Sequence, residues 1–285
     1  MVALGTPSCG HTVRMGRSVT RHVYDIRDTA AGIHRALPSP FLTFVVTVDA
    51  PLRMLGPDGG PTDFRLCLAG LHDTPGTIVH PGHQRGIQVS VDPLAARALF
   101  GLPAAALAGH SVEAAEVLGR IGGELGERVD AGTTWDARLA ALDDVLLRLR
   151  HAHDDGRRTA DDLRRAWARV QEGRPVREVA REVGWSPDHL SRRFTAEFGV
   201  RPSVAGRMAR FHRVRREIAR RAGAGRLDLA GVAADHGYAD QAHLAREFRA
   251  FAGCSATRWV AEEVHGGLVG SVQDAEPVPG TSSAA

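Results

Sequence analysis

The chain has 285 residues, 43% of them hydrophobic, which is enough for two ordinary domains that each bury a core. No stretch approaches the roughly 18 consecutive apolar residues of a membrane span, and the first 20 residues lack a leader-like apolar core. The three cysteines (Cys9, Cys67, Cys254) form no CxxC pair, which argues against a disulfide framework and a thiolate zinc site. We therefore expect a cytoplasmic protein with no membrane partner.

The charge is unevenly distributed along the chain. There is no lysine, so all 36 basic residues are arginines, and the net charge is +3. Residues 157–265 contain 22 arginines against 14 acidic residues, a net charge of +8, so the remainder carries −5. Arginine pairs with phosphate and releases condensed counterions, so this asymmetry predicts a half that faces nucleic acid. The alternative is an ordinary solvated helical surface.

The N-terminal half is predicted to be rich in β-strands. Residues 1–18, rich in Gly, Ser and Arg, and the small polar residues 266–285 are expected to be disordered. Between them, residues 19–155 are expected to form a sensor or dimerisation domain, because short apolar runs alternate there with turn sequences. The predicted strands are Phe41–Val48, Phe64–Leu71, Thr77–His80 and Gly86–Val91. A small barrel or sandwich fits this pattern.

Beyond Pro93 the sequence takes on a helical pattern, rich in Ala and Leu. The predicted helical segments are Leu94–Phe100, Pro103–Leu107, Ser111–Glu127 and Trp135–His153. They could cover the open face of the sheet or form a dimerisation helix pair. A polar break at residues 151–158 marks a domain boundary, and Thr159 with Asp162 is expected to begin the first helix of a second domain, residues 157–265.

This second domain contains a weak internal repeat. Residues 175–185 align with residues 228–238 at an offset of 53, with Gly184-Trp185 matching Gly237-Tyr238. After this point the offset becomes 54, and the apolar and glycine positions match again: Leu190, Phe194 and Gly199 with Leu244, Phe248 and Gly253. One inserted residue in the second turn accounts for the change.

Each copy has the pattern of a helix-turn-helix unit. A short helix ends at a glycine, which permits a sharp left-handed turn without a Cβ penalty. The second helix then begins at Ser186-Pro187 in the first copy and at Asp240 in the second. Leucine and phenylalanine four residues apart fix this helix across the first one and leave its opposite face free.

That free face supplies the candidate DNA contacts. Arg192 and Arg246 occupy equivalent positions, and an arginine there is suited to bidentate bonding with guanine O6 and N7 in the major groove. The alternative is that both are ordinary solvated arginines. Helical geometry, with the first turn of the second recognition helix included, gives the full candidate set: Asp188, Ser191, Arg192, Thr195, Gln241, Ala242, Ala245, Arg246 and Arg249.

One long helix, Ser203–Ala222, is predicted between the copies, with an apolar stripe that includes Met208 and Phe211. It would span roughly 30 Å at about 1.5 Å per residue, close to the roughly 34 Å between successive major-groove faces of B-DNA. The arginines away from that stripe could contact phosphates or keep the helix soluble: Arg207, Arg210, Arg213, Arg216 and Arg220.

Residues 159–263 resemble the DNA-binding domain of the AraC/XylS family of transcription regulators, most specifically in the stretch Val232–Gly253. Ala256 stands where that family usually has a proline, which leaves open how the chain leaves the last recognition helix. The resemblance implies an α+β chain, in which an N-terminal β-rich, cupin-like domain precedes an all-α DNA-binding domain with two helix-turn-helix units. It also implies double-stranded DNA as a partner, with RNA polymerase, a small-molecule effector and a second copy of the chain as further possible partners.

Three histidines in the β-rich half (His72, His80, His83) invite a metal-site interpretation, but no carboxylate is spaced with them as cupin ligand sets require. Arg85 could bind a carboxylate ligand or pair with an acidic neighbour, and we favour the pairing. We predict no metal, no cofactor and no catalytic residue. The rival hypothesis is a cupin-type metal-dependent enzyme with an accessory nucleic-acid-binding module.

Overall fold

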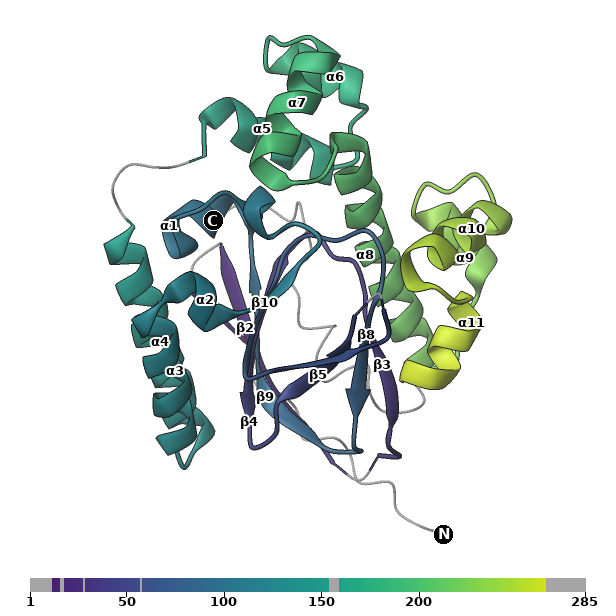
Figure 1. The fold of residues 1–285 in the computed structure, drawn as a ribbon. Helices are drawn as coiled ribbons and strands as arrows, with labels where there is room; N and C mark the ends of the chain where they lie inside the picture. The colour runs from purple at the N-terminus through teal and green to yellow at the C-terminus, as the bar shows by residue number, and fades with distance from the viewer. Residues whose placement is uncertain (1–11, 16–17, 28, 57, 154–158, 265–285) are drawn as a thin grey trace.

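The computed structural model describes residues 12–15, 18–27, 29–56, 58–153 and 159–264, and the text below concerns these residues (Figure 1). Antiparallel strands dominate the chain up to residue 113, and helices follow. We call β1 to α4 the β-rich half and α5 to η3 the helical half. The predicted α+β fold class, β-rich first and all-α second, is confirmed.

Two antiparallel sheets form the β-rich half. The six-stranded sheet has the order β1 (Thr12–Met15), β2 (Val19–Ile26), β9 (Gln84–Val91), β4 (Leu42–Val48), β7 (Leu66–Ala69) and β10 (Ser111–Glu113). The four-stranded sheet has the order β3 (Gly32–Ala36), β8 (Gly76–His80), β5 (Leu52–Leu55) and β6 (Pro61–Phe64). All four strands expected from the sequence are present, as β4, β7, β8 and β9.

The six-stranded sheet is buried on both faces, as its central strand β4 shows. Successive side chains of a strand point to opposite faces. Leu42, Phe44 and Val46 therefore pack into the large core under the helices, whereas Thr43 and Val45 face a cavity between the two sheets. This alternation creates both the core that supports the helices and an internal space.

Strand β2 was not expected, because Arg21 and His22 interrupt its apolar pattern. Both residues are buried. Arg21 forms an ion pair with Asp143 of α4, so the covering helix supplies its counter-charge. Residues 1–18 were expected to be disordered, yet Thr12–Met15 pairs with β2 as strand β1. Residues 1–11, 16–17 and 266–285 lie outside the described residues.

The helices of the β-rich half are η1 (Pro93–Ala95), α1 (Ala96–Phe100), η2 (Ala104–Leu107), α2 (Ala114–Leu118), α3 (Arg120–Ala131) and α4 (Trp135–Ala152). The prediction of one helix over Ser111–Glu127 is wrong. The segment starts as strand β10, because it pairs with the edge of β7 and the Glu113 carboxylate accepts hydrogen bonds from the backbone N–H groups of Arg65 and Leu66. Gly119, with φ of +56°, then separates α2 from α3.

The helical half comprises α5 (Asp161–Gln171), α6 (Val176–Glu182), α7 (Pro187–Phe198), α8 (Pro202–Gly223), α9 (Leu229–Asp235), α10 (Gln241–Ala252), α11 (Ala256–Trp259) and η3 (Val260–Val264). Figure 1 shows α5 to α7 around the start of α8 and α9 to α11 beside its later turns. Thr159 does not cap α5 as expected, because Ala160 is the N-cap and the buried Thr159 hydroxyl donates to Glu197 instead.

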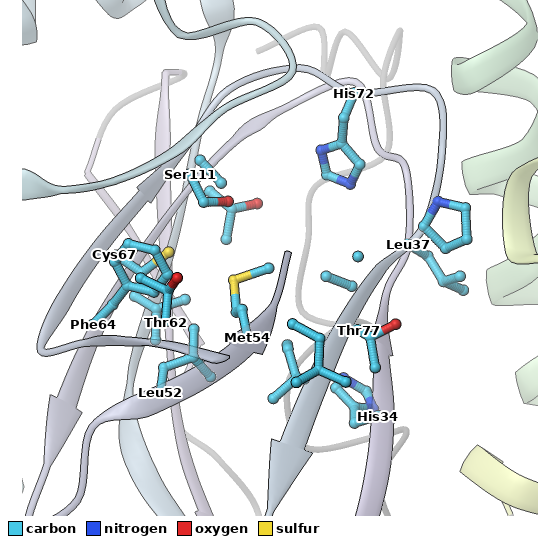
Figure 2. Close-up of a pocket in the computed structure, with 18 of the residues that line it drawn as sticks. His34, Leu37, Leu52, Met54, Thr62, Phe64, Cys67, His72, Thr77 and Ser111 are labelled. Carbon is cyan, nitrogen blue, oxygen red and sulfur yellow. The ribbon is translucent and has the colours of Figure 1, made fainter. Parts of the chain in front are cut away.

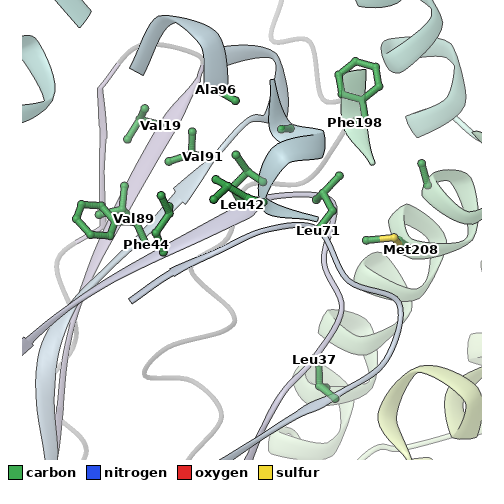
Figure 3. Close-up of a cluster of buried hydrophobic side chains, with 14 of the residues drawn as sticks. Val19, Leu37, Leu42, Phe44, Leu71, Val89, Val91, Ala96, Phe198 and Met208 are labelled. Atoms are coloured by element: carbon green, nitrogen blue, oxygen red, sulfur yellow. The ribbon is translucent and has the colours of Figure 1, made fainter. Parts of the chain in front are cut away.

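One hydrophobic core joins the two halves. Its members include Leu42, Phe44 and Leu71 of the β-rich half and Phe198 and Met208 of the helical half (Figure 3). All five side chains are at most 1% exposed. No helix in the described part of the chain is both long and apolar enough to cross a membrane.

The close approach of the two halves at Gly199 can be tested by substitution. Gly199 has φ of +78°, and an added Cβ would overlap the Cβ of Ala108 next to η2. We expect Gly199→Ala to cost about 1–2 kcal/mol for the left-handed backbone and about 1–3 kcal/mol more for overpacking. Gly253→Ala, at the equivalent position with φ of +69° and only an ordinary contact to Pro75, should show the backbone cost alone. Equal losses in urea unfolding would contradict the overpacking.

Candidate nucleic-acid interface

The first helix-turn-helix unit consists of α6 and α7. Gly184, with φ of +75°, lies in the turn that follows α6. The N–H of Trp185 in the same turn donates to the carbonyl of Ala180 at 2.8 Å. Ser186 then caps α7 by accepting from the N–H of His189 at 3.2 Å, with Pro187 in the first helical position. The start of α7 is therefore as the sequence predicts.

The second unit, α9 and α10, repeats these contacts. Gly237 has φ of +73°, and the N–H of Tyr238 donates to the carbonyl of Ala233 at 3.0 Å. Asp240 caps α10 through the N–H of His243 at 2.6 Å. Helix α9 begins 53 residues after α6, and α10 begins 54 residues after α7. The structure therefore confirms the single inserted residue in the second turn.

Aromatic packing seats each recognition helix on its neighbours. In the first unit, Trp167 of α5 packs on Phe198 with ring centroids 4.4 Å apart. In the second unit, Phe211 of α8 packs on Phe248 at 5.3 Å and on Phe251 at 5.0 Å. Offset and edge-to-face pairs of this kind stabilise a helix position beyond their buried area. Both recognition helices therefore have one fixed buried face and one outward face.

The candidate DNA contacts differ in exposure. Six side chains are exposed: Asp188, Arg192, Gln241, Ala242, Arg246 and Arg249. Three are partly buried at the border of the outward face: Ser191, Thr195 and Ala245. The Thr195 hydroxyl lies 3.5 Å from the Val200 carbonyl and donates a long hydrogen bond to it. This bond engages the Thr195 hydroxyl with the backbone just beyond the end of α7.

The arginines of α8 mostly have partners within the protein. Arg207 and Arg210 both contact the buried carboxylate of Glu247, at 3.0 and 2.7 Å, and Arg213 donates to the carbonyl of Gln171 at 2.9 Å. Arg220 pairs with Glu217 at 2.7 Å. By contrast, within the described residues Arg192, Arg246 and Arg249 form no ion pair.

Glu247 is the electrostatic centre of the second unit. Its burial favours the neutral acid, but hydrogen bonds from Arg210, Tyr238 and Arg207 outweigh burial and lower the pKa of Glu247. The Tyr238 hydroxyl donates to it at 2.7 Å, and burial first and this hydrogen bond second raise the pKa of Tyr238. One carboxylate thus fastens α10 to α8 and to the turn, which presents Arg246 on a rigid helix.

Ala256, where a proline is usual in the resembling family, does not disturb the exit from α10. Gly253 closes α10 in the left-handed conformation, with φ of +69°. Ser255 then caps α11 by accepting from the N–H of Arg258 at 3.2 Å, and Ala256 is the first helical residue. The serine cap fixes the start of α11 without a proline.

The β-rich half contains a cavity of about 770 Å³. Its apolar wall includes Ile26, Leu52, Phe64 and Ile78, and Figure 2 shows Met54 projecting into its middle. The polar lining includes His34, His72, Gln88 and Ser111, and also Arg215, a 1% exposed residue of α8. The helix between the two helix-turn-helix units therefore forms part of the cavity wall.

The three histidines singled out in the sequence occupy different surroundings. His72 lines the cavity, His80 is buried and His83 is exposed. Burial, assisted by neighbouring His34, lowers the pKa of His80. Among the residues that the structure describes, no group of three or more His, Cys, Asp or Glu side chains is arranged to hold a metal ion. Arg85 pairs with Asp49 at 2.8 Å and lies 3.4 Å from Asp25, as favoured.

Sequence reasoning missed the buried groups of α8 and the carboxylates that join the two halves. Arg215 could not be told apart in the sequence from the other arginines of the arginine-rich α8, although it is buried. Glu197 and Glu263 were not singled out either, although both are buried and bonded to residues of the β-rich half. Their partners lie 100 and 229 residues away in the sequence, beyond the reach of any local pattern.

Comparison with known proteins supports the assignment of the helical half. Residues 179–262 match the family model of a helix-turn-helix domain, which confirms the predicted AraC-type domain there. An apo variant of ToxT from Vibrio cholerae aligns with a TM-score of 0.50 and 9% identity over 87% of this chain and 99% of that chain. This likeness concerns the fold.

Two further ToxT structures from the same organism align with slightly lower scores. One has a TM-score of 0.49 and 10% identity, covering 86% of this chain and 98% of that chain. The other, bound to an unsaturated fatty acid, has a TM-score of 0.47 and 9% identity, covering 87% and 97%. No curated protein matches the chain.

Glu217 gives a pH-dependent test of the link between α8 and α9. Hydrogen bonds from Arg220 and then Arg221 outweigh burial and lower the pKa of Glu217 to about 2, and Arg221 also contacts Asp235 of α9 at 2.6 Å. Because the folded pKa lies below the unfolded value of about 4.3, this stabilisation is present above pH 5 and is lost as the pH falls toward 2. The difference in unfolding free energy between wild type and Glu217→Gln should shrink over that range.

The control for this experiment is Glu116→Gln, an exposed residue of α2 that forms no ion pair within the described part of the chain. Its difference from wild type should stay flat with pH. A flat profile for Glu217→Gln as well would show that its ion pairs do not contribute to stability.

Proposed function

Because residues 179–262 form an AraC-type helix-turn-helix domain, we propose that the chain is a sequence-specific DNA-binding transcription regulator. The observation that carries this proposal is the pair of equally built units, each of which presents an exposed, unpaired arginine, Arg192 or Arg246, at the equivalent position of a capped recognition helix. A solvated surface would not require two matching turns, caps and buried faces behind the two arginines.

The helix between the units supports simultaneous binding of both in the major groove. Helix α8 has 22 residues, and at about 1.5 Å per residue it spans roughly 33 Å. One turn of B-DNA separates successive major-groove faces by about 34 Å. In this proposal one chain places α7 and α10 in two successive major grooves on one side of the duplex.

The residues divide into three proposed roles. Arg192 and Arg246 read guanine O6 and N7, and the small side chain of Ala242 lets α10 approach the bases. Asp188, Gln241 and Arg249 are exposed at the same surface: Asp188 can accept from cytosine N4, and Gln241 and Arg249 contact bases or phosphates. Ser191, Thr195 and Ala245 line the border of that surface and take part less directly.

At the domain level, we propose residues 157–265 as the DNA-binding domain and residues 19–155 as the sensor or dimerisation domain. RNA polymerase and a second copy of the chain are further partners expected under this proposal. The paired helices α3 and α4 lie at the outer side of the β-rich half, away from α7 and α10 (Figure 1), so a partner there would leave the DNA surface open.

The DNA-reading role of the two arginines can be tested once a site has been selected from random duplex DNA. We expect Arg192→Ala and Arg246→Ala each to weaken binding to the selected site by about 1–3 kcal/mol and to relax the preference at one base pair. Arg165→Ala is the matched control, because Arg165 is exposed on α5 and pairs with Asp162 outside the recognition surface. Equal losses on selected and random DNA would identify the arginines as phosphate contacts.

We further propose that the cavity binds a small amphipathic molecule that changes DNA affinity. The support is its composition: an apolar wall with Leu52 and Phe64, and a buried guanidinium from α8, Arg215, that could meet an acidic head group. A long-chain carboxylate has this chemistry, as does the unsaturated fatty acid bound by ToxT. Because Arg215 belongs to α8, such a ligand would touch both halves.

Filling the cavity with a larger side chain tests the proposed ligand binding. Met54→Trp should abolish saturable binding of an unsaturated long-chain fatty acid in calorimetry, because the larger ring occupies the middle of the cavity, whereas Met54→Leu should retain it. The alcohol of the same chain length should bind more weakly than the acid, because it carries no charge for Arg215. Unchanged binding by Met54→Trp would place the ligand elsewhere.

A further inference from the structure

Glu197 attaches the first helix-turn-helix unit to the β-rich half. Its side chain is 9% exposed and projects from the recognition helix α7. Both of its oxygens accept from Arg97 of α1, at 2.8 Å each, and Oε1 also accepts from the hydroxyl of Thr159 at 3.1 Å. A bidentate arginine–carboxylate pair fixes orientation as well as distance. Helix α7 is thus held at a definite angle to α1.

Glu263 attaches the segment that follows the second unit to strand β3 of the β-rich half. It lies in η3, directly after α11, and is fully buried. One oxygen lies 2.5 Å from Nδ1 of His34, and the other accepts from the backbone N–H of Arg35 at 3.0 Å and from its guanidinium at 3.2 Å. Arg35 also pairs with neighbouring Glu262 at 2.7 Å. Strand β3 thus holds η3, and Trp259 of the preceding α11 packs on Phe248 of α10 with ring centroids 5.7 Å apart, which carries the attachment to the second unit.

Neither attachment is part of the helix-turn-helix fold itself. At the offset of 54 that relates α7 to α10, the position of Glu197 is occupied by Phe251, which packs on Phe211 inside the helical half. The second unit therefore has no copy of the first attachment. Each unit therefore has its own contact with the β-rich half.

These contacts close a ring of three parts. The first unit joins the second through α8, and both join the β-rich half, whose core residues belong to the same hydrophobic cluster as those of α7 and α8. A single long helix can bend or twist along its length, so α8 alone sets the relative position of α7 and α10 loosely. Attachment of both units to a third body removes that freedom.

We propose that Glu197 and Glu263 are positioning residues that make the β-rich half, rather than α8 alone, set the separation and relative rotation of the two recognition helices. The chain would then discriminate between DNA sites by the number of base pairs between the two half-sites. This inference rests on the proposed DNA-binding function. It differs from a ligand-binding role because it concerns the geometry of DNA reading.

The first test is selection from random duplex DNA with the full chain. Wild type should enrich two half-sites at one spacing. The double variant Glu197→Gln, Glu263→Gln should enrich the same half-sites but spread over at least one extra base pair of spacing, because the amides cannot replace the charge-assisted bonds. Glu182→Gln, which loses an exposed ion pair between α6 and Arg169 of α5 within the helical half, should keep the single spacing. A merely destabilised protein would bind less DNA without altering the spacing.

The second test measures the separation directly and needs no DNA. Ala196 and Ala250 are exposed, occupy equivalent positions on α7 and α10, and can each be replaced by cysteine for spin labelling in a chain with Cys9→Ser, since Cys67 and Cys254 are buried. The distance distribution between the labels should be narrow in the otherwise wild-type chain and broader in the glutamine double variant. Arg97→Lys, which keeps a charge but loses the bidentate geometry, should broaden it to a smaller extent.

The outcomes separate this inference from the proposed function. If the double variant folds and both its label distances and its enriched spacing equal those of wild type, the two glutamates do not set the geometry and the inference is wrong. If wild type enriches no DNA sequence, the proposed function fails, and the distance distributions still decide whether the two glutamates position the units. If the double variant does not fold, Arg97→Lys and Arg35→Lys provide the same comparison from the β-rich side.

Discussion

Helix α8 packs against three neighbours at once, and the positions of the other elements depend on these contacts. Its apolar residues pack against α5, and Phe211 packs against the recognition helix of the second unit. A third face meets the β-rich half, where His212 lies 5.8 Å from the ring of Phe41 and Arg215 reaches the cavity. Close-packed interiors transmit small displacements. A shift of α8 would therefore displace residues of both units and of the cavity wall together.

Because the chain contains no lysine, its electrostatic contacts depend on the planar, multi-donor arginine side chain. One carboxylate commonly serves two guanidinium groups, as Glu247 does for Arg207 and Arg210, and Glu217 for Arg220 and Arg221. Each shared carboxylate cancels one of the two positive charges, so α8 itself stays positively charged. On the recognition helices, Arg192, Arg246 and Arg249 form no ion pair within the described residues and add exposed positive charge there.

The helix-turn-helix units could be predicted because their determinants are local: left-handed glycines, serine and aspartate caps, and apolar residues four apart. The same reasoning failed where distant partners decide the outcome. Strand β2 was missed because Arg21 is buried only with help from Asp143, and Ser111–Glu113 became a strand because β7 offers an open edge. Thr159 looked like a helix cap, but Glu197 provided a better partner. Arg192 and Arg246 were placed on the exposed face by periodicity alone.

The difference between Glu197 and Phe251 also restricts how the two units could be rearranged. A repeat is interchangeable only if each copy needs nothing outside itself. Exchanging the order of the units would bring a phenylalanine against Arg97 and place a carboxylate in the aromatic cluster around Phe211. Both substitutions bury groups without suitable partners. The two units therefore cannot be exchanged in order along the chain. Any rearranged version of the helical half would have to keep the first unit next to Arg97 and the second next to Phe211.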